Sequence, residues 1–424
     1  MVSRIISLVA LNYKEHFLKY LDKSGDLPRI KEIAERYKKK IKKNNKHQMP
    51  LVILLEIDVV LLTEISGSFS RVLLSEPDTA SCFIRDVVHC AASVLADIPH
   101  LQVQDLQLLL RLKCIPALPG LTKMGPVGPT GLVLLKGILV AHTRPFKYTR
   151  SAMFCCLVKH CSEEKQFRLE GDRIQSAPRC PQCKSEMREN CRARDTADRV
   201  LGLLVCPDAL ENSTSKHAIR HQSVLVCFQD ELIADLKLGV RYDVSGVQQN
   251  LFFQAWNVRL WKSGIDTKVH HPGIPSLPLP PSICTLHSVL SYRCPHSPWS
   301  LVTALAAQMA SDVYPTTALL HLKLGLLLSL ASQGKNQPPV PVLAVGPDTL
   351  AAHHVFMRGS YLAQRCIKVN SLSVCSSLEG LAHNDEQGYT WLEAGALLLS
   401  STGVCLLGDW TKFKSSNSVS SLLS

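Results

Sequence analysis

The spacing of apolar positions predicts a helical region over the first 115 residues. Apolar side chains recur at helical intervals in segments 13–21 and 30–41. Segments 81–95 and 103–112 lack the glycines and prolines that commonly interrupt strands. We therefore expect residues 1–115 to form an α-helical N-terminal subdomain.

The pattern then changes to short apolar runs separated by turn residues. Glycines and prolines between residues 119 and 131 predict loops. Strand-like runs follow at 132–141, 201–205, 223–228 and 240–247. The first run is broken at Lys136 and Gly137, which predicts a bulge or a tight bend. Short strands in series are typical of a small β-barrel, which we expect over residues 116–265.

A proline-rich stretch separates this region from a third one. Five prolines lie between residues 270 and 282, so we expect a linker with polyproline character over residues 266–297. Past it, the pattern predicts helices at 299–310, 316–332 and 355–363, and short strands at 342–345 and 403–407. The last eleven residues, 414–424, include six serines and are typical of a disordered tail.

The amino-acid composition argues against a disordered or a membrane-spanning protein. The 424 residues are 46% hydrophobic and 19% charged, which excludes a wholly disordered chain. The most apolar stretches are interrupted by Glu56, Asp58, His321 and Lys323, and the apolar run at the N-terminus is too short for a signal peptide. We therefore expect an intracellular protein that does not span a membrane, with its sixteen cysteines reduced.

The formal net charge of +12 suits a polyanionic partner such as nucleic acid. Part of it is concentrated in a run of six lysines, Lys38, Lys39, Lys40, Lys42, Lys43 and Lys46. Such a run is typical either of a solvated helix end or of a nucleic-acid or import patch. The sequence leaves both readings open.

Four cysteines have the spacing of a zinc site. Cys180 and Cys183 enclose two residues, so that one turn can place both sulfurs on a single ion. Cys156 and Cys161 enclose four residues and form the expected second pair, with His160 as an alternative ligand. We predict a structural zinc ion with no open position for catalysis, the alternative being four reduced thiols.

A candidate nucleotide-binding loop follows the expected strand 342–345, but it lacks the side chains that bind phosphate and magnesium. A phosphate-binding loop needs a glycine-rich turn, a lysine for the phosphates and a hydroxyl for magnesium. Here only Gly346 remains, while Ala352 replaces the lysine and His353 replaces the hydroxyl. The adjacent His353 and His354 do not face one another on a helix, so we expect no metal pair there.

Taken in order, the motifs resemble the minichromosome maintenance (MCM) family of replicative helicases. The similar segments are 135–140, 144–145, 154–156, 223–226, 230–232, 239–247, 312–314, 319–330, 392–397 and 403–413. The resemblance implies an α+β multi-domain protein. Its parts would be a helical N-terminal subdomain, an oligonucleotide-binding (OB) fold with a zinc ribbon inserted over residues 154–191, and a partial AAA+ segment over residues 298–413.

The departures from the family pattern imply that the chain is not an enzyme. At the Walker B position the adjacent Asp and Glu of an active MCM protein are replaced by Gly408 and Asp409. With Ala352 and His353 at Walker A, the lysine, the hydroxyl and the magnesium carboxylate are all missing, so ATP is not an expected cofactor. The sequence stops after the third of five AAA+ strands, from which we expect a C-terminally truncated form, such as a splice product.

The resemblance to a catalytically degenerate branch of the family implies a nuclear role in meiotic homologous recombination and double-strand break repair. The expected partners are DNA, most readily single-stranded, and recombination or MCM-like proteins, with no membrane and no small-molecule substrate. Cations beside the first strands of the barrel are the expected DNA contacts: Lys136, Arg144, Lys147 and Arg150. The aromatic segment 251–256 either stacks on bases or, more commonly, packs against the barrel. The alternative function is an interaction scaffold that docks on MCM-like proteins without affinity for DNA.

Overall fold

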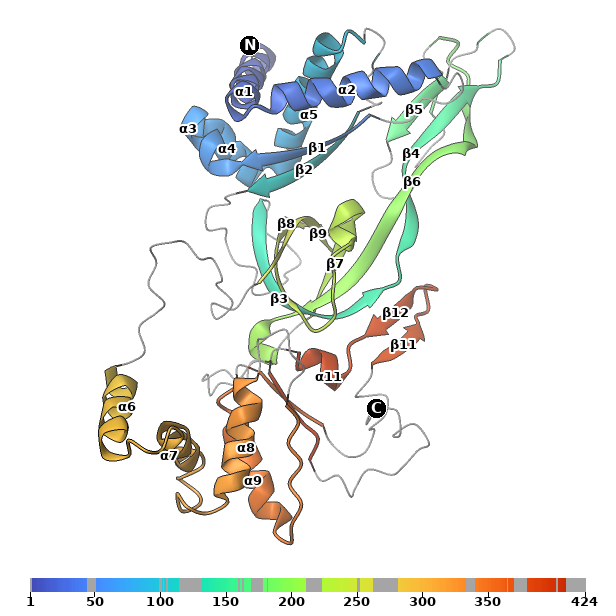
Figure 1. Ribbon diagram of the computed structural model, residues 1–424. Helices are drawn as coiled ribbons and strands as arrows, with labels where there is room; N and C mark the ends of the chain where they lie inside the picture. Colours follow the sequence, from blue (N-terminus) through green and yellow to red (C-terminus); the bar gives the residue numbers. More distant parts are fainter. Residues whose placement is uncertain are drawn as a thin grey trace.

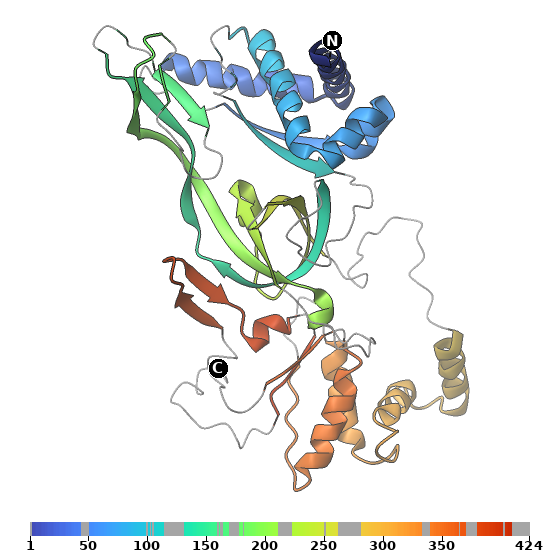
Figure 2. The ribbon, with the colours of Figure 1, turned by 180° about the vertical axis from the view of Figure 1, so that it is seen from behind.

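A computed structural model shows helices at both ends of a large sheet (Figures 1 and 2). It describes residues 2–43, 51–98, 101, 103, 106–113, 131–158, 161, 164–168, 178–180, 182–210, 223–249, 252–261, 281–332, 340–363, 365–369, 380–401 and 403–408. The expected disordered tail, and most of the proline-rich stretch, lie outside these residues. Among the described helices, none has both the length and the apolarity that a membrane span needs.

The N-terminal part is helical, as predicted, but it also contains a small parallel sheet. Its helices are α1 (Val2–Ser24), α2 (Asp26–Lys43), α3 (Val59–Ile65), α4 (Gly67–Ser75) and α5 (Pro77–Leu95). They pack around β1 (Leu51–Asp58) and β2 (Leu106–Lys113), which pair in parallel from Leu51↔Leu106 to Asp58↔Lys113. The predicted helix at 103–112 is therefore wrong. Its Leu-rich stretch gains more from pairing with β1, where Leu106, Leu108 and Leu112 are buried, than from its local helix propensity.

The central part is a nine-stranded sheet. Its strands are β3 (Leu132–Thr143), β4 (Phe146–Cys156), β5 (Glu164–Arg168), β6 (Met187–Val205), β7 (Ser223–Gln229), β8 (Arg241–Gln248), β9 (Phe253–Leu260), β11 (Leu381–Asn384) and β12 (Thr390–Glu393). Their order is β11-β12-β3-β8-β9-β7-β6-β4-β5, and β3 pairs with β6 as well, so the sheet curls on itself. The predicted strands are confirmed, and the mixed α and β composition with them.

The sheet is larger than the small barrel that the sequence predicts. Two features enlarge it: β4 and β6 extend together as a long arm, and the hairpin β11–β12 adds to β3 from far along the chain. The predicted break at Lys136 and Gly137 is also wrong, because both residues pair regularly with β8 and the register shift lies between Leu139 and Ala141. Gly137 instead permits close approach, since a Cβ there would lie 2.9 Å from the Leu204 Cβ.

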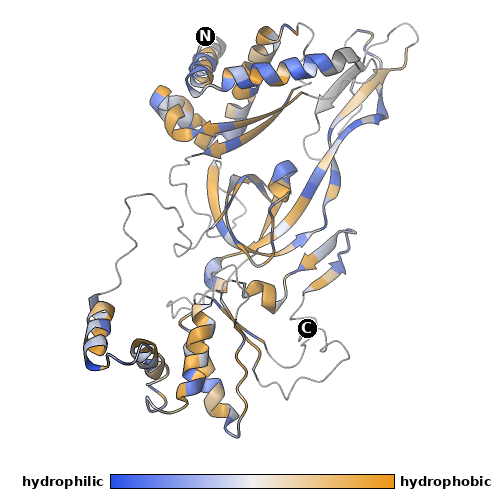
Figure 3. Cartoon of the chain, viewed as in Figure 1, coloured by the Kyte–Doolittle hydropathy of each residue, from blue (hydrophilic) through white to orange (hydrophobic). Residues whose placement is uncertain are grey.

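Within its described residues, the C-terminal part has four helices, a short helical turn and a two-stranded parallel sheet. The elements are α6 (Pro281–Arg293), α7 (Ser300–Gln308), α8 (Leu320–Ala331), α9 (Thr349–Ser360), β10 (Cys366–Lys368), α11 (Ala396–Leu399) and β13 (Val404–Leu406). Met309, Leu326 and Val355 form its small core, and α8 is apolar over most of its surface (Figure 3). Helix α6, at the end of the expected linker, has no buried residue.

The expected strand at 342–345 is not formed. Among the described residues, β13 pairs with β10 rather than with this segment. Leu343 is 75% exposed and Val345 is 89% exposed, so an apolar run without a neighbouring strand remains irregular. The expected strand at 403–407 is confirmed as β13.

Gly239 lies where the C-terminal part contacts the sheet. The Gly239 carbonyl accepts a 2.7 Å hydrogen bond from Nη1 of Arg365, a side chain that is only 1% exposed. The same Nη1 donates to the Leu399 carbonyl over 2.8 Å, and the Gly239 N–H donates to the Leu139 carbonyl on β3. Gly239 has a φ of +77°, and a Cβ there would lie 1.9 Å from the Leu398 carbonyl oxygen. No side chain fits at this position.

We predict that Gly239→Ala destabilises the chain by more than about 2 kcal/mol, because backbone strain and a clash with Leu398 add together. Gly25→Ala is the matched control, since Gly25 has a φ of +76° but nothing within 4 Å. It carries the strain alone, about 1 to 2 kcal/mol. Guanidinium titration followed by tryptophan fluorescence measures both values. Equal losses in the two variants would contradict the tight packing at Gly239.

Candidate metal centre

The four predicted cysteines meet at the tip of the long arm of the sheet. Strands β4 and β6 pair from Phe146↔Arg199 to Cys156↔Met187, with β5 on the far side of β4. Cys156 ends β4 and Met187 begins β6, so the segments that carry the other three cysteines lie between them in the chain. The pairing of the strands therefore brings the two cysteine pairs together although 18 residues separate Cys161 from Cys180.

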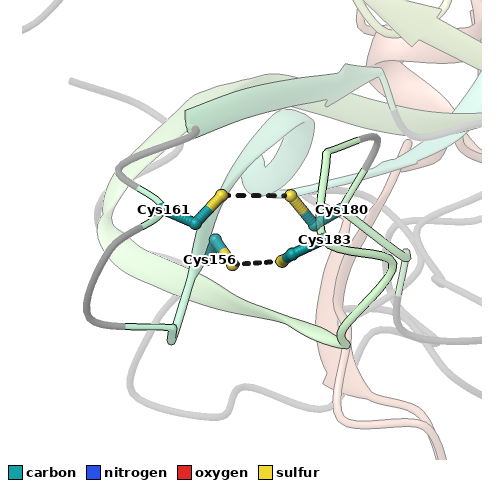
Figure 4. A group of neighbouring side chains, drawn as sticks. All are labelled: Cys156, Cys161, Cys180 and Cys183. Carbon is teal, nitrogen blue, oxygen red and sulfur yellow. Dashed lines mark hydrogen bonds between the residues drawn. The ribbon is translucent and has the colours of Figure 1, made fainter.

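The sulfur atoms are arranged as ligands of a single ion. All four Sγ atoms lie within 4.8 Å of one another. The Cys156 and Cys183 sulfurs are 3.3 Å apart, and those of Cys161 and Cys180 are 3.6 Å apart (Figure 4). A tetrahedral ion with Zn–S bonds of about 2.3 Å places its sulfurs about 3.8 Å apart. The cluster can hold a metal ion with little rearrangement.

Local turns orient each pair. The Cys161 N–H donates to the Val158 carbonyl over 2.8 Å, which closes the first turn. In the second turn the Cys180 N–H donates to the Ser185 carbonyl over 2.8 Å, and the Lys184 N–H donates to the Cys180 carbonyl over 2.9 Å. Lys184 adopts a positive φ of 58°, which reverses the chain after Cys183. Each pair is thus held by its own backbone hydrogen bonds.

Burial and hydrogen bonding differ between the thiols. Cys180 is 1% exposed and packs with Ala152, Phe154 and Met187 in a small core behind the site. Cys183 is exposed, and hydrogen bonds from the side chain and then the backbone of Ser185 lower the pKa of its thiol to about 6. The thiolate is the form that binds a metal. Sequence reasoning did not identify Ser185, although a hydroxyl two residues after a metal-binding turn is a usable signal.

Neighbouring candidates do not join the cluster. Cys155 lies next to Cys156 on β4, where successive side chains point to opposite faces, and it is not among the four clustered residues. His160, the alternative ligand, lies outside the described residues. The donor set within the described chain is therefore four thiols, which suits a soft or borderline ion such as zinc better than magnesium or calcium.

The four cations expected to contact DNA have different environments. Lys136 on β3 and Arg144 after it are exposed. Lys147 forms an ion pair with Asp198 at 2.8 Å. Arg150 is paired with Asp230 and donates to Gln107 Oε1 over 3.1 Å. Arg150 is thus engaged within the protein and Lys147 in an exposed ion pair, while Lys136 and Arg144 are exposed and have no ion pair among the described residues.

Asp230, which sequence reasoning did not identify, explains why Arg150 is engaged. It adopts a positive φ of 59° at the start of the 3₁₀ turn η3 (Asp230–Ile233). Its Oδ1 also accepts from the Tyr148 hydroxyl over 3.4 Å. Nothing in the local sequence marks this contact, because the two residues are 80 positions apart.

The segment of the degenerate nucleotide-binding motif, from Gly346 to His353, includes the capped N-terminus of α9. Asp348 caps α9, and its Oδ1 accepts from the Ala351 N–H over 2.9 Å. A carboxylate therefore lies at the helix N-terminus, where a phosphate would bind. Ala352 is partly exposed and His353 is exposed. A Cβ added at Gly346 would meet no described atom within 4 Å, so the turn is open to its surroundings.

At the other motif, Gly408 has a φ of +74° and Asp409 lies outside the described residues. In the aromatic segment 251–256, Phe253 is fully buried in the sheet and Trp256 packs against the N-terminal core. These two rings pack rather than offer a stacking surface.

Comparison with known proteins finds one matching family and several similar chains. The family described as MCMDC2, N-terminal domain, matches residues 13–115. Minichromosome maintenance domain-containing protein 2 of Mus musculus is 24% identical over 428 residues, which are 95% of this chain and 61% of the relative. The proteins of the same name from Rattus norvegicus and Homo sapiens are also 24% identical and cover the same shares.

The chain thus spans about three fifths of the length of these curated relatives. The similarity extends from the helical N-terminal part through the metal arm into the C-terminal part. The chain is similar, over 95% of its length, to minichromosome maintenance domain-containing protein 2.

Proposed function

We propose that this chain is a non-catalytic nuclear MCM-family protein that acts in meiotic homologous recombination and double-strand break repair, through binding of DNA, recombination partners or both. The observation that carries the proposal is the similarity over 95% of the chain to minichromosome maintenance domain-containing protein 2. The loss of the nucleotide-binding residues supports a binding role rather than a motor role. The charge of +12 is compatible with DNA.

In this proposal the curled strands β3, β8, β9, β7 and β6 serve as the OB-type module. Each of the five pairs with two of the others, which is the connectivity that such a module needs. The arm formed by β4, β5 and β6 is the zinc ribbon. Cys156, Cys161, Cys180 and Cys183 would hold a structural zinc ion that fixes the tip of the arm, where the small core of Ala152, Phe154 and Met187 is too limited to do so alone.

We predict about one zinc ion per chain after native purification, measured by plasma mass spectrometry. Cys180→Ser combined with Cys183→Ser removes one ligand pair and lowers the content below about half an equivalent. Cys155→Ser, one residue from a ligand but outside the cluster, is the matched control and keeps the wild-type content. Less than about half an equivalent in the wild-type chain would count against the site.

The same proposal excludes ATP turnover. Phosphoryl transfer requires groups that neutralise the charge developing on the phosphate, and Ala352, His353 and Gly408 supply none. The Asp348 carboxylate at the start of α9 adds a negative charge where phosphates would approach, and it occupies the Ala351 N–H. Both effects oppose nucleotide binding as well as hydrolysis.

We predict that phosphate release from magnesium ATP by the full chain equals that of a buffer blank. Asp348→Ala is expected to give the same result, because removal of the cap restores neither the lysine nor the magnesium ligand. Hydrolysis above the blank that stays with the wild-type chain through a further purification step would overturn the non-catalytic assignment.

DNA binding separates the proposal from the alternative of a scaffold without DNA affinity. Each phosphate contact on single-stranded DNA contributes about 0.7 to the slope of log affinity against log salt. Arg144→Ala is expected to weaken binding and lower that slope by about 0.7. Lys147→Ala is expected to do less, because Lys147 is already paired with Asp198.

Fluorescence anisotropy of a labelled oligothymidylate between about 50 and 300 mM salt measures these values. Denaturation midpoints confirm that the variants fold. A wild-type chain that shows no salt-dependent binding supports the scaffold alternative instead.

A further inference from the structure

The turn that joins α6 to α7 contains the dipeptide Ser297–Pro298. In all 424 residues, no other serine or threonine is followed by a proline. The Ser297 N–H donates to the Cys294 carbonyl over 3.0 Å, and the Ser297 carbonyl accepts from the Ser300 N–H over 3.2 Å. The backbone of Ser297 therefore connects the end of α6 with the start of α7.

This turn is accessible to an enzyme. Helix α6 lies at the edge of the C-terminal part (Figures 1 and 2), and none of its residues is buried. Residues 291–299, which include Ser297, are all exposed. A residue that precedes proline favours extended backbone, the form in which peptides enter a binding groove. Because no apolar core has to open, the turn can enter such a groove while the rest of the chain stays folded.

The proline selects one class of enzyme. Proline has no backbone N–H, so a binding pocket without an acceptor at this position accepts Ser-Pro and disfavours any other residue after the serine. Protein kinases with such a pocket are the proline-directed serine/threonine kinases. Ser297 is the one hydroxyl-bearing residue of the sequence that meets this requirement.

The surroundings of Ser297 suit a phosphate. Helix α7 begins at Ser300 without a side-chain cap, so the N–H groups of its first turn can donate to an anion. Arg293, in the last turn of α6, and His296 are exposed, and neither forms an ion pair with a described residue. Arg293 also offsets the partial negative charge at the end of α6, which would otherwise repel a phosphate.

We propose that a proline-directed kinase phosphorylates Ser297 and that the phosphate links the N-terminus of α7 to Arg293 of α6. In the reaction, Oγ of Ser297 bonds to the γ-phosphorus of ATP, and the bond from that phosphorus to the bridging oxygen breaks. ADP leaves, and the hydroxyl proton passes to the catalytic carboxylate of the kinase. The phosphate adds a charge of about −2 and three acceptor oxygens.

This modification goes beyond the proposed function and does not depend on it. It would fix α6, which has no buried residue of its own, to the rest of the C-terminal part. The site is thus a regulatory one, with a protein kinase as the partner and the position of α6 as the property that changes.

The first test locates the phosphate. The full chain, incubated with a purified cyclin-dependent kinase and ATP, is expected to incorporate phosphate at Ser297, as measured by mass spectrometry of its peptides. Pro298→Ala is expected to slow incorporation between about 5- and 150-fold, because the N–H that it adds finds no acceptor in the kinase. Ser300→Ala, which removes a nearby serine followed by leucine, is the matched control and keeps the wild-type rate. Phosphate mainly at other residues, or an unchanged rate in Pro298→Ala, would overturn the assignment.

The second test measures the link between the helices. Phosphorylation of Ser297 is expected to slow amide hydrogen exchange in the first turn of α7 between about 2- and 30-fold, the effect of a good helix N-cap. Arg293→Gln is expected to be phosphorylated at the wild-type rate but to lose the accompanying protection in the last turn of α6. Equal exchange before and after phosphorylation, or full protection of α6 in Arg293→Gln, would refute the link.

Discussion

The structure depends on β3 pairing with three different strands. Its first half pairs with β8, its centre with β6, and its last three residues with β12, two of them also with β6. Leu132 packs in the N-terminal core, while Val133, Leu135 and Leu139 form the interior of the curled sheet. This arrangement requires the backbones to come close, which explains Gly137 against Leu204 and Gly202 against Leu139. One strand thereby connects the helical N-terminal part, the sheet and the C-terminal hairpin.

The tip of the long arm of β4 and β6 is stabilised differently from the rest of the sheet. Away from β3, the tip of β4 and β6 has only a small apolar core behind its cysteines, namely Ala152, Phe154 and Met187. So little buried surface cannot by itself order a loop, and four thiols around one ion would supply the missing stabilisation. The hydrogen bonds from Ser185 prepare Cys183 for this role by favouring its thiolate. The rest of the sheet has larger apolar cores of its own.

Local patterns in the sequence predicted the parts of the structure that local chemistry decides. Helices α1, α2 and α5 and strands β3, β7, β8 and β13 follow from spacing within short segments, as does each of the two cysteine pairs. The predictions were wrong where residues distant in the sequence determine the secondary structure. Segment 103–112 contains β2 because β1 lies beside it and pairs with it. Segment 342–345 stays irregular because no described strand pairs with it. The pairing of Arg150 with Asp230, across 80 positions, is likewise absent from any local pattern.

Contacts between residues distant in the sequence also limit what the net charge of the chain can predict about nucleic-acid binding. Several cations form ion pairs with carboxylates of the same chain: Arg150 with Asp230 and Arg111 with Glu231, and, on the surface, Lys147 with Asp198. Others are buried and donate to backbone carbonyls, as Lys323 does to Pro315 and Arg365 does to Gly239. In the net charge of +12 each paired cation is cancelled by its carboxylate, and the buried cations cannot reach the phosphates of a nucleic acid. A cation on the sheet contributes to binding only where its strand neighbours leave it exposed and unpaired, a condition that register decides and composition does not.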